Sequence, residues 1–153
     1  MSSSDTGPMR CDFCRIARGD DGSIEVICTA KKWIAFFPLN PATPGHTLVI
    51  PRVHVANLWE VEPALGCELM AAVIKVGRAI TSALKPDGMN LITSAGESAE
   101  QTVFHLHMHL VPRWRRDGFG PIWQRKEQRN NVEIADVANR IRQTCANASS
   151  ITG

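Results

Sequence analysis

Apolar residues recur along the chain with two different periods, and each period predicts one kind of secondary structure. A long helix is predicted over 62–84, because apolar residues return there every three or four positions: Leu65, Leu69, Val73, Val76, Ile80 and Leu84. Pro63 is tolerated in the first turn of such a helix, and Pro86 follows its end. A second, C-terminal helix is predicted over 132–145, where a similar spacing is kept by Val137, Ile141 and Cys145.

Short apolar segments bounded by turn-forming residues predict five strands. They cover 23–28, 33–37, 47–50, 90–94 and 104–112. Three strands, a helix, two strands and a helix therefore follow one another, and strands do not alternate with helices. This order predicts an α+β fold with an antiparallel sheet.

The last of these segments, FHLHMHLVP, places His105, His107 and His109 at every second position. On a strand, residues two apart point the same way and lie ~6.6 Å apart, so the three imidazoles line one face. The opposite face enters the core with Leu106, Met108 and Leu110.

Three imidazoles in register are difficult to explain as an incidental feature of a half-buried strand. Buried neutral rings each need a hydrogen-bond partner, and neighbouring charged rings repel each other. Two functional interpretations stay open on these residues alone. One is a zinc site to which a His-x-His pair supplies two ligands, and the other is nucleophilic catalysis by an imidazole.

Composition and charge narrow the class of protein. The 153 residues, with 44% hydrophobic and 21% charged residues, suit one globular domain. We expect that domain over 10–146, between a disordered tail at 1–9 and a flexible tail at 147–153. The net charge of +2 gives no reason to expect a nucleic acid or an anionic membrane as partner. No apolar run approaches the ~20 residues of a membrane span, and the first residues lack a secretory signal. We expect a cytoplasmic protein.

The five cysteines are an odd number and are spread along the chain, which makes a poor disulfide framework and suits a reducing compartment. Cys11 and Cys14 stand out because they form a CDFC pair. A thioredoxin-like redox pair would need a βαβ context, and none follows. A zinc site is the better interpretation if two more ligands are found elsewhere in the chain.

Two longer stretches resemble the histidine-triad (HIT) family of nucleotide hydrolases and transferases. They are TPGHTLVIPRVH (43–54) and QTVFHLHMHLVPR (101–113). The family signature is His-φ-His-φ-His-φ-φ, with φ apolar, and residues 105–111 match it throughout. The CDFC pair and DGFGPIW (117–123) resemble the zinc-containing bacterial branch in particular.

This resemblance implies a fold, an activity and a role for each histidine. The HIT fold has a five-stranded antiparallel sheet, one long central helix and a C-terminal helix, and its sheet extends across a homodimer. His107 would attack the α-phosphorus of a nucleoside phosphoramidate or dinucleoside polyphosphate, and water would then release a nucleoside monophosphate. His109 would hold the phosphate. A structural Zn²⁺ would be bound by Cys11, Cys14, His54 and His105.

The resemblance also indicates which residues would bind the substrate and where the chain departs from its family. Beside His109, the substrate-binding residues would be Phe13, Ile16, Phe36, Ser94, Gln101 and Thr102. Pro38 stands where many members have an acidic residue that holds the ribose, Ser94 where Asn is common, and Glu100 where Gly is common. We expect His46 to be a structural residue of the loop before the third strand.

Two other functions are compatible with these motifs. One is a nucleotide-binding sensor or adaptor that keeps the fold with negligible turnover, for which Pro38 and Glu100 leave room. The other is a metalloenzyme with a catalytic zinc on the triad, which leaves the CDFC pair and the GHTLVIP strand unexplained.

Overall fold

The computed structural model describes residues 10–123 and 131–149. The chain divides into two compact units, Met1–Phe119 and Gly120–Gly153. The predicted tail at 1–9, and the last residues of the predicted tail at 147–153, lie outside the described residues.

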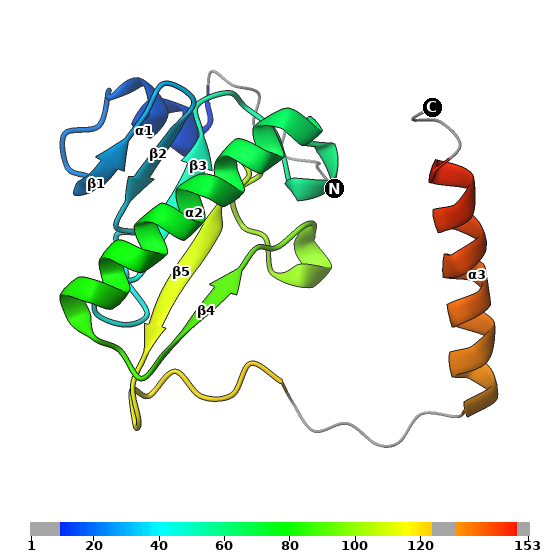
Figure 1. Cartoon of the computed structure of the whole chain (residues 1–153). Helices are drawn as coiled ribbons and strands as arrows, with labels where there is room; N and C mark the ends of the chain where they lie inside the picture. The colour runs from blue at the N-terminus through cyan, green and yellow to red at the C-terminus, as the bar shows by residue number, and fades with distance from the viewer. Residues whose placement is uncertain (1–9, 124–130, 150–153) are drawn as a thin grey trace. The chain divides into compact units, whose positions relative to one another are not determined.

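The first unit is built on a five-stranded antiparallel sheet, which confirms the predicted α+β class (Figure 1). Its elements in chain order are α1 (Asp12–Arg18), β1 (Val26–Thr29), β2 (Trp33–Phe36), β3 (Thr47–Pro51), η1 (Leu58–Glu60), α2 (Pro63–Leu84), β4 (Gly88–Ile92), η2 (Glu97–Ala99) and β5 (Met108–Arg113). The strands lie in the order β1-β2-β3-β5-β4. The predicted strands all exist, with ends shifted by a few residues.

Helix α2 covers one face of this sheet and forms the larger core. Its predicted apolar stripe packs against β2, β3 and the residues around β5: the buried members are Leu69, Val73, Val76 and Ile80. Burying an aliphatic side chain of this size contributes ~1.5–3 kcal/mol. The stripe is therefore used within the monomer. The outer side of α2 leaves Met70 and Ile74 exposed.

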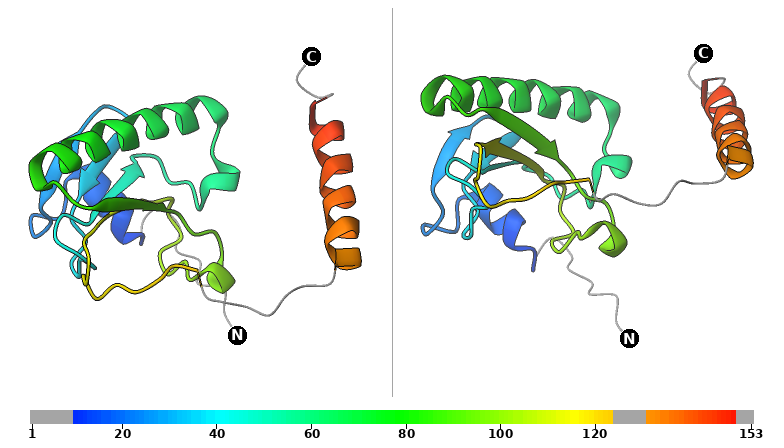
Figure 2. Two further views of the ribbon diagram at one scale, coloured as in Figure 1. Left: turned by 60° about the horizontal axis from the view of Figure 1, so that its bottom comes forward. Right: turned by 90° about the horizontal axis from the view of Figure 1, so that it is seen from below.

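Helix α1 packs on the other face of the sheet, and the sequence pattern did not predict it. Successive residues of a strand point to opposite faces, so Ala35 joins the core under α2 while Ile34 and Phe36 pack with Ile16 of α1. Figure 2 shows α2 and α1 on opposite sides of the sheet. The helix spans only seven residues before Gly19 ends it in a left-handed conformation (φ 84°). So short a segment shows no clear apolar period.

The histidine segment departs from the predicted continuous strand, because β5 begins only at Met108. The backbone N–H of Leu106 donates to Val55 O instead of to a neighbouring strand. His105 and His107 therefore precede the strand, and His109 alone of the three lies in it. The anchoring role of the intervening residues is confirmed, since Leu106, Met108 and Leu110 are all buried.

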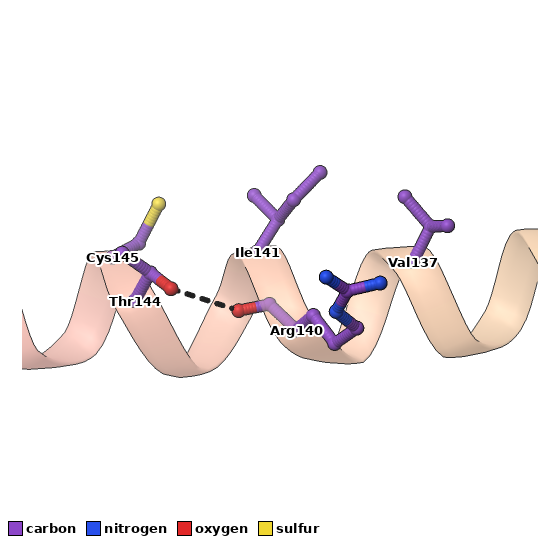
Figure 3. A pocket seen from close by; sticks show the side chains of 5 residues that line it. All are labelled: Val137, Arg140, Ile141, Thr144 and Cys145. Atoms are coloured by element: carbon purple, nitrogen blue, oxygen red, sulfur yellow. Dashed lines mark hydrogen bonds between the residues drawn. The ribbon is translucent and has the colours of Figure 1, made fainter.

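The second unit contains α3 (Asn131–Ser149), which runs past the predicted end at Cys145. Val137, Ile141 and Cys145 follow one another along one side of this helix (Figure 3). Val137 and Ile141 are exposed, by 44% and 58%. None of the helices in the described part of the chain combines the length and hydropathy needed to cross a membrane.

Candidate active site and metal centre

Two cysteines and two histidines from distant parts of the chain meet beside the start of α1. His105 Nδ1 lies 3.6 Å from Cys11 Sγ and 3.5 Å from Cys14 Sγ, and His54 Nδ1 lies 3.3 Å from Cys14 Sγ. In a tetrahedral site with Zn–S near 2.3 Å and Zn–N near 2.0 Å, sulfur and nitrogen ligands are ~3.6 Å apart. These three sulfur–nitrogen pairs therefore have the spacing of a tetrahedral site, and all four donor atoms lie within 4.8 Å of one another.

The protonation of this cluster also suits a cation. His105 Nε2 lies 2.9 Å from Pro51 O. Because a carbonyl can only accept, Nε2 carries the proton and Nδ1 turns a lone pair to the sulfurs. Burial lowers the pKa of His105 to about 4, so the ring is neutral at pH 7. Burial, reinforced by Cys11, raises the pKa of Cys14 to about 11. Two cysteines and two histidines become a stable thiolate–imidazole set when a metal ion supplies the positive charge.

His107 lies next in the segment and presents the opposite ring nitrogen. Its Nδ1 is 2.7 Å from His105 O, so Nδ1 donates and Nε2 keeps its lone pair. Burial lowers the pKa of His107, which keeps the ring neutral. The backbone beneath it is fixed by Thr93, whose hydroxyl donates to His107 O. His107 is thus a neutral imidazole with an unprotonated Nε2, which is the nucleophilic form.

His109 is held by His46, a contact that the sequence analysis did not anticipate. The N–H of Ala42 donates to His46 Nδ1 at 3.0 Å, so His46 carries its proton on Nε2. That Nε2 lies 2.9 Å from His109 Nδ1 and donates to it. Burial lowers the pKa of His109 to about 4, with further lowering by His107 and His46. The neutral His109 ring therefore carries its proton on Nε2, and its centroid is 4.9 Å from that of His107.

A pocket of about 480 Å³ lies on the α1 side of the sheet, and none of the triad histidines is among the described residues that line it. Four residues predicted to bind substrate line it: Phe13, Ile16, Phe36 and Thr102. Further apolar walls come from Ile24, Leu48 and Val103, and polar groups from Arg15, Asp21 and Asn40. The Phe13 ring also stands edge-on to His107, with 5.1 Å between ring centroids. A flat apolar group in the pocket would therefore lie against Phe13, whose ring contacts His107.

The other predicted substrate residues occupy the loop that leads into the triad. Gln101 is buried and braces this loop, because Oε1 accepts from Gly96 N and Nε2 donates to Ala56 O. Ser94 is half-buried just after β4 and is not one of the described residues that line the pocket. Glu100 has φ 63°, a left-handed conformation that favours glycine. The geometry makes Gln101 a support of the loop and leaves Thr102 facing the pocket.

A model of the HIT domain matches residues 23–116, which is more than half of the chain. The chain belongs to the HIT family. It is 42% identical over 130 residues to the protein named hit of Bacillus subtilis, a match that covers 84% of this chain and 88% of that protein. A crystal structure from Streptococcus mutans superposes with a TM-score of 0.81 at 35% identity, covering 94% of this chain and 87% of the other.

Two other HIT relatives have names that describe a chemistry. An adenosine 5'-monophosphoramidase of Schizosaccharomyces pombe is 34% identical, over 75% of this chain and 84% of that protein. A zinc-bound histidine triad family protein of Mycobacterium smegmatis has a TM-score of 0.68 at 35% identity, with 80% of this chain and 87% of the other covered. This chain therefore shares its family and fold with these proteins. It contains a cluster that could bind a metal, and one relative is named as zinc-bound.

Proposed function

We propose that this HIT protein is a nucleotide hydrolase that cleaves at the α-phosphate of nucleoside phosphoramidates or dinucleoside polyphosphates. The observation that carries the proposal is the hydrogen bond from His107 Nδ1 to His105 O, because it leaves Nε2 unprotonated on a ring that contacts Phe13 of the pocket wall. Nε2 attacks the α-phosphorus, a P–N bond to His107 forms, and the bond to the leaving group breaks. Water then hydrolyses the nucleotidyl-histidine and releases the nucleoside monophosphate.

His109 stabilises the charge that develops on the phosphate. Its Nε2–H, fixed by the chain of hydrogen bonds from Ala42 through His46, donates to a non-bridging oxygen. A donor held in place before the reaction needs no reorganisation when the charge appears. Thr102 lines the pocket beside Val103, and its hydroxyl serves the phosphate and the leaving group.

The base and ribose occupy the apolar pocket. Phe13, Ile16 and Phe36 supply the walls, and an aromatic wall next to His107 places the α-phosphate near the nucleophile. The monophosphoramidase name of the fission-yeast relative supports a phosphoramidate substrate.

The four-residue cluster holds a structural Zn²⁺. The name of the zinc-bound mycobacterial relative supports this metal. When bound, zinc stabilises the two thiolates and ties α1, the loop after β3 and the start of the triad segment together. Because four protein ligands fill the tetrahedron, the metal offers no position to substrate. This closed ligand set argues against a catalytic zinc on the triad.

The protein is a cytoplasmic homodimer in which the sheets of two copies join through their α2 helices. The exposed Met70 and Ile74 on the outer side of α2 support this contact, because an isologous interface needs an apolar patch that can meet its own copy. Light scattering at micromolar concentration should give twice the chain mass of 16.8 kDa. A mass equal to one chain would reject the dimer.

Turnover of adenosine 5'-phosphoramidate tests the activity and separates it from the alternatives. The hydrolase should release AMP, and samples quenched with alkaline denaturant, which preserves a P–N bond to imidazole, should contain an AMP adduct on His107 by mass spectrometry. A sensor or adaptor would bind AMP without turnover. A catalytic-zinc enzyme would lose its activity upon brief chelation at a temperature where the fold persists, whereas the hydrolase proposed here would keep it until it unfolds.

A further inference from the structure

An ion pair lines the pocket on the α1 side. Arg15 Nη2 donates to Asp21 Oδ2 at 2.9 Å, and both residues contribute to the pocket wall. Asp21 Oδ1 accepts from both the N–H and the hydroxyl of Ser23, at 3.1 and 2.6 Å. These hydrogen bonds, and the one from Arg15, lower the pKa of Asp21. Asp21 is therefore a carboxylate that only accepts hydrogen bonds, fixed in orientation at the wall of a mostly apolar pocket.

This arrangement differs from an ordinary surface ion pair. The Asp21 side chain is only 19% exposed, whereas the nearby Arg18–Asp20 pair is exposed by 52% and 56% and does not line the pocket. Exposed pairs contribute little to stability. A carboxylate with three fixed donors that still borders a ligand-sized pocket is arranged to meet a ligand.

We propose that Asp21 and Arg15 read the edge of the nucleobase and select a 6-aminopurine. The inference rests on the proposed function, since it assumes that the pocket binds a nucleoside. Adenine presents an N6 amino donor next to the N7 acceptor, and 6-oxopurines present two acceptors, O6 and N7, at the same edge. Asp21 accepts from N6–H and Arg15 donates to N7. A 6-oxopurine brings O6 against the carboxylate, which cannot donate.

Arg15 could instead bind O6 and N7 of a 6-oxopurine through two parallel N–H groups. The orientation of its side chain disfavours this alternative. Both terminal nitrogens of Arg15 face carboxylates, Nη2 toward Asp21 at 2.9 Å and Nη1 toward Asp12 at 3.7 Å. The guanidinium fork is therefore turned to its own acidic neighbours, and a 6-oxopurine held by both of its nitrogens would bring O6 toward the Asp21 carboxylate.

The test compares three substrates that differ only at purine C6. These are the 5'-phosphoramidates of adenosine, purine riboside and inosine, and kcat/KM is measured for each with wild type, Asp21→Asn and the control Asp20→Asn. Wild type should prefer adenosine over inosine by roughly 10- to 100-fold, the range expected for one hydrogen bond to a charged group. Purine riboside, which loses the amino group but adds no acceptor, should fall between them.

Asp21→Asn should abolish this preference, because a carboxamide can turn its NH₂ to O6 or its oxygen to N6. Asp20→Asn should keep it. Equal kcat/KM for adenosine and inosine in wild type, or an unchanged preference in Asp21→Asn, would overturn the inference. Dissociation constants of AMP and IMP are measured for the same proteins. Tighter binding of AMP without any turnover would reject the proposed hydrolysis and keep the base contact, while turnover without discrimination would do the reverse.

Discussion

The metal-compatible cluster and the proposed catalytic site each contain a histidine, His105 and His107, and the two rings present opposite nitrogens. In both regions a backbone carbonyl decides which ring nitrogen is available. His105 donates through Nε2 to Pro51 O and turns Nδ1 to two buried sulfurs. His107 donates through Nδ1 to His105 O and keeps its lone pair on Nε2. The difference shows that the carbonyl that accepts from one ring nitrogen determines which nitrogen of the imidazole keeps its lone pair, and therefore what the ring can do.

The largest effect is expected from removing the proposed nucleophile, His107. His107→Ala should reduce turnover of adenosine 5'-phosphoramidate to background, on the order of 10⁶-fold, since other nucleophile deletions have effects of this size. Zinc content and thermal stability should stay close to those of wild type, because His107 is not one of the four clustered residues. Turnover near the wild-type rate would show that another group attacks the phosphorus.

The next prediction concerns the loss of one ligand from the four-residue cluster. Cys11→Ser should release the metal and lower the free energy of unfolding by several kcal/mol, because metal binding energy is folding energy. Elemental analysis and thermal unfolding measure both effects. Wild-type protein without zinc, together with an unchanged Tm in Cys11→Ser, would reject the structural metal.

Removing the phosphate donor should cost less than removing the nucleophile. His109→Ala should lower kcat by 10²–10³-fold, the range for loss of one oxyanion donor, with zinc content unchanged. Single-turnover kinetics show whether the lost rate belongs to the chemical step. A decrease confined to KM would mean that His109 contributes binding rather than transition-state stabilisation.

The contact behind His109 should have a smaller effect. His46→Ala removes the donor that fixes the His109 tautomer, and the expected loss in kcat is roughly 10- to 100-fold, as for second-layer partners of functional histidines. His46→Gln keeps an amide donor and should recover part of the rate. Equal losses in both variants, with equal decreases in Tm, would point to a role in folding alone.

The smallest change is expected in the preference of the pocket for ribose over 2'-deoxyribose. Pro38 lines the pocket and has no side-chain acceptor for the ribose hydroxyls. Wild type should therefore discriminate poorly between ribose and 2'-deoxyribose substrates, and Pro38→Asp should gain about tenfold in ribose preference. Matched ribo- and deoxyribonucleoside phosphoramidates measure the ratio. Strong ribose preference in wild type would identify Asn40, which also lines the pocket, as the substitute acceptor.

Long periodic patterns could be predicted from the sequence, and short or bent segments could not. Helix α2 carries six apolar positions in register, and four of them are buried as predicted, whereas Leu65 is partly buried and the last, Leu84, is exposed. Helix α1 has barely two turns, so its boundaries depend on packing against Phe36 and on the left-handed Gly19. The strand expected through the whole triad was wrong before Met108, because alternation cannot reveal that Leu106 bonds to Val55.

The parts of the site that belong to a sequence motif could be predicted from the sequence. The contacts that arise only when strands pair could not. The cluster of Cys11, Cys14, His54 and His105 comes together as expected. His46 meets His109 only because Leu48 of β3 lies opposite His109 of β5, and no local pattern contains that register. The Arg15–Asp21 pair was missed for the same reason, since single charges in a turn carry no periodic signal.

The strand order also determines when during folding the site can exist. β1, β2 and β3 pair with their neighbours in sequence, and β4 pairs with β5, whereas β3 and β5 are separated by the whole of α2. Closing such a long loop costs chain entropy before its contacts can compensate, so nonlocal pairing is slow. The contacts of His46 with His109, and of Cys14 with His105, both cross this pairing. We therefore expect the β3–β5 pairing to form after α2. During refolding, turnover should recover later than the helical circular dichroism signal.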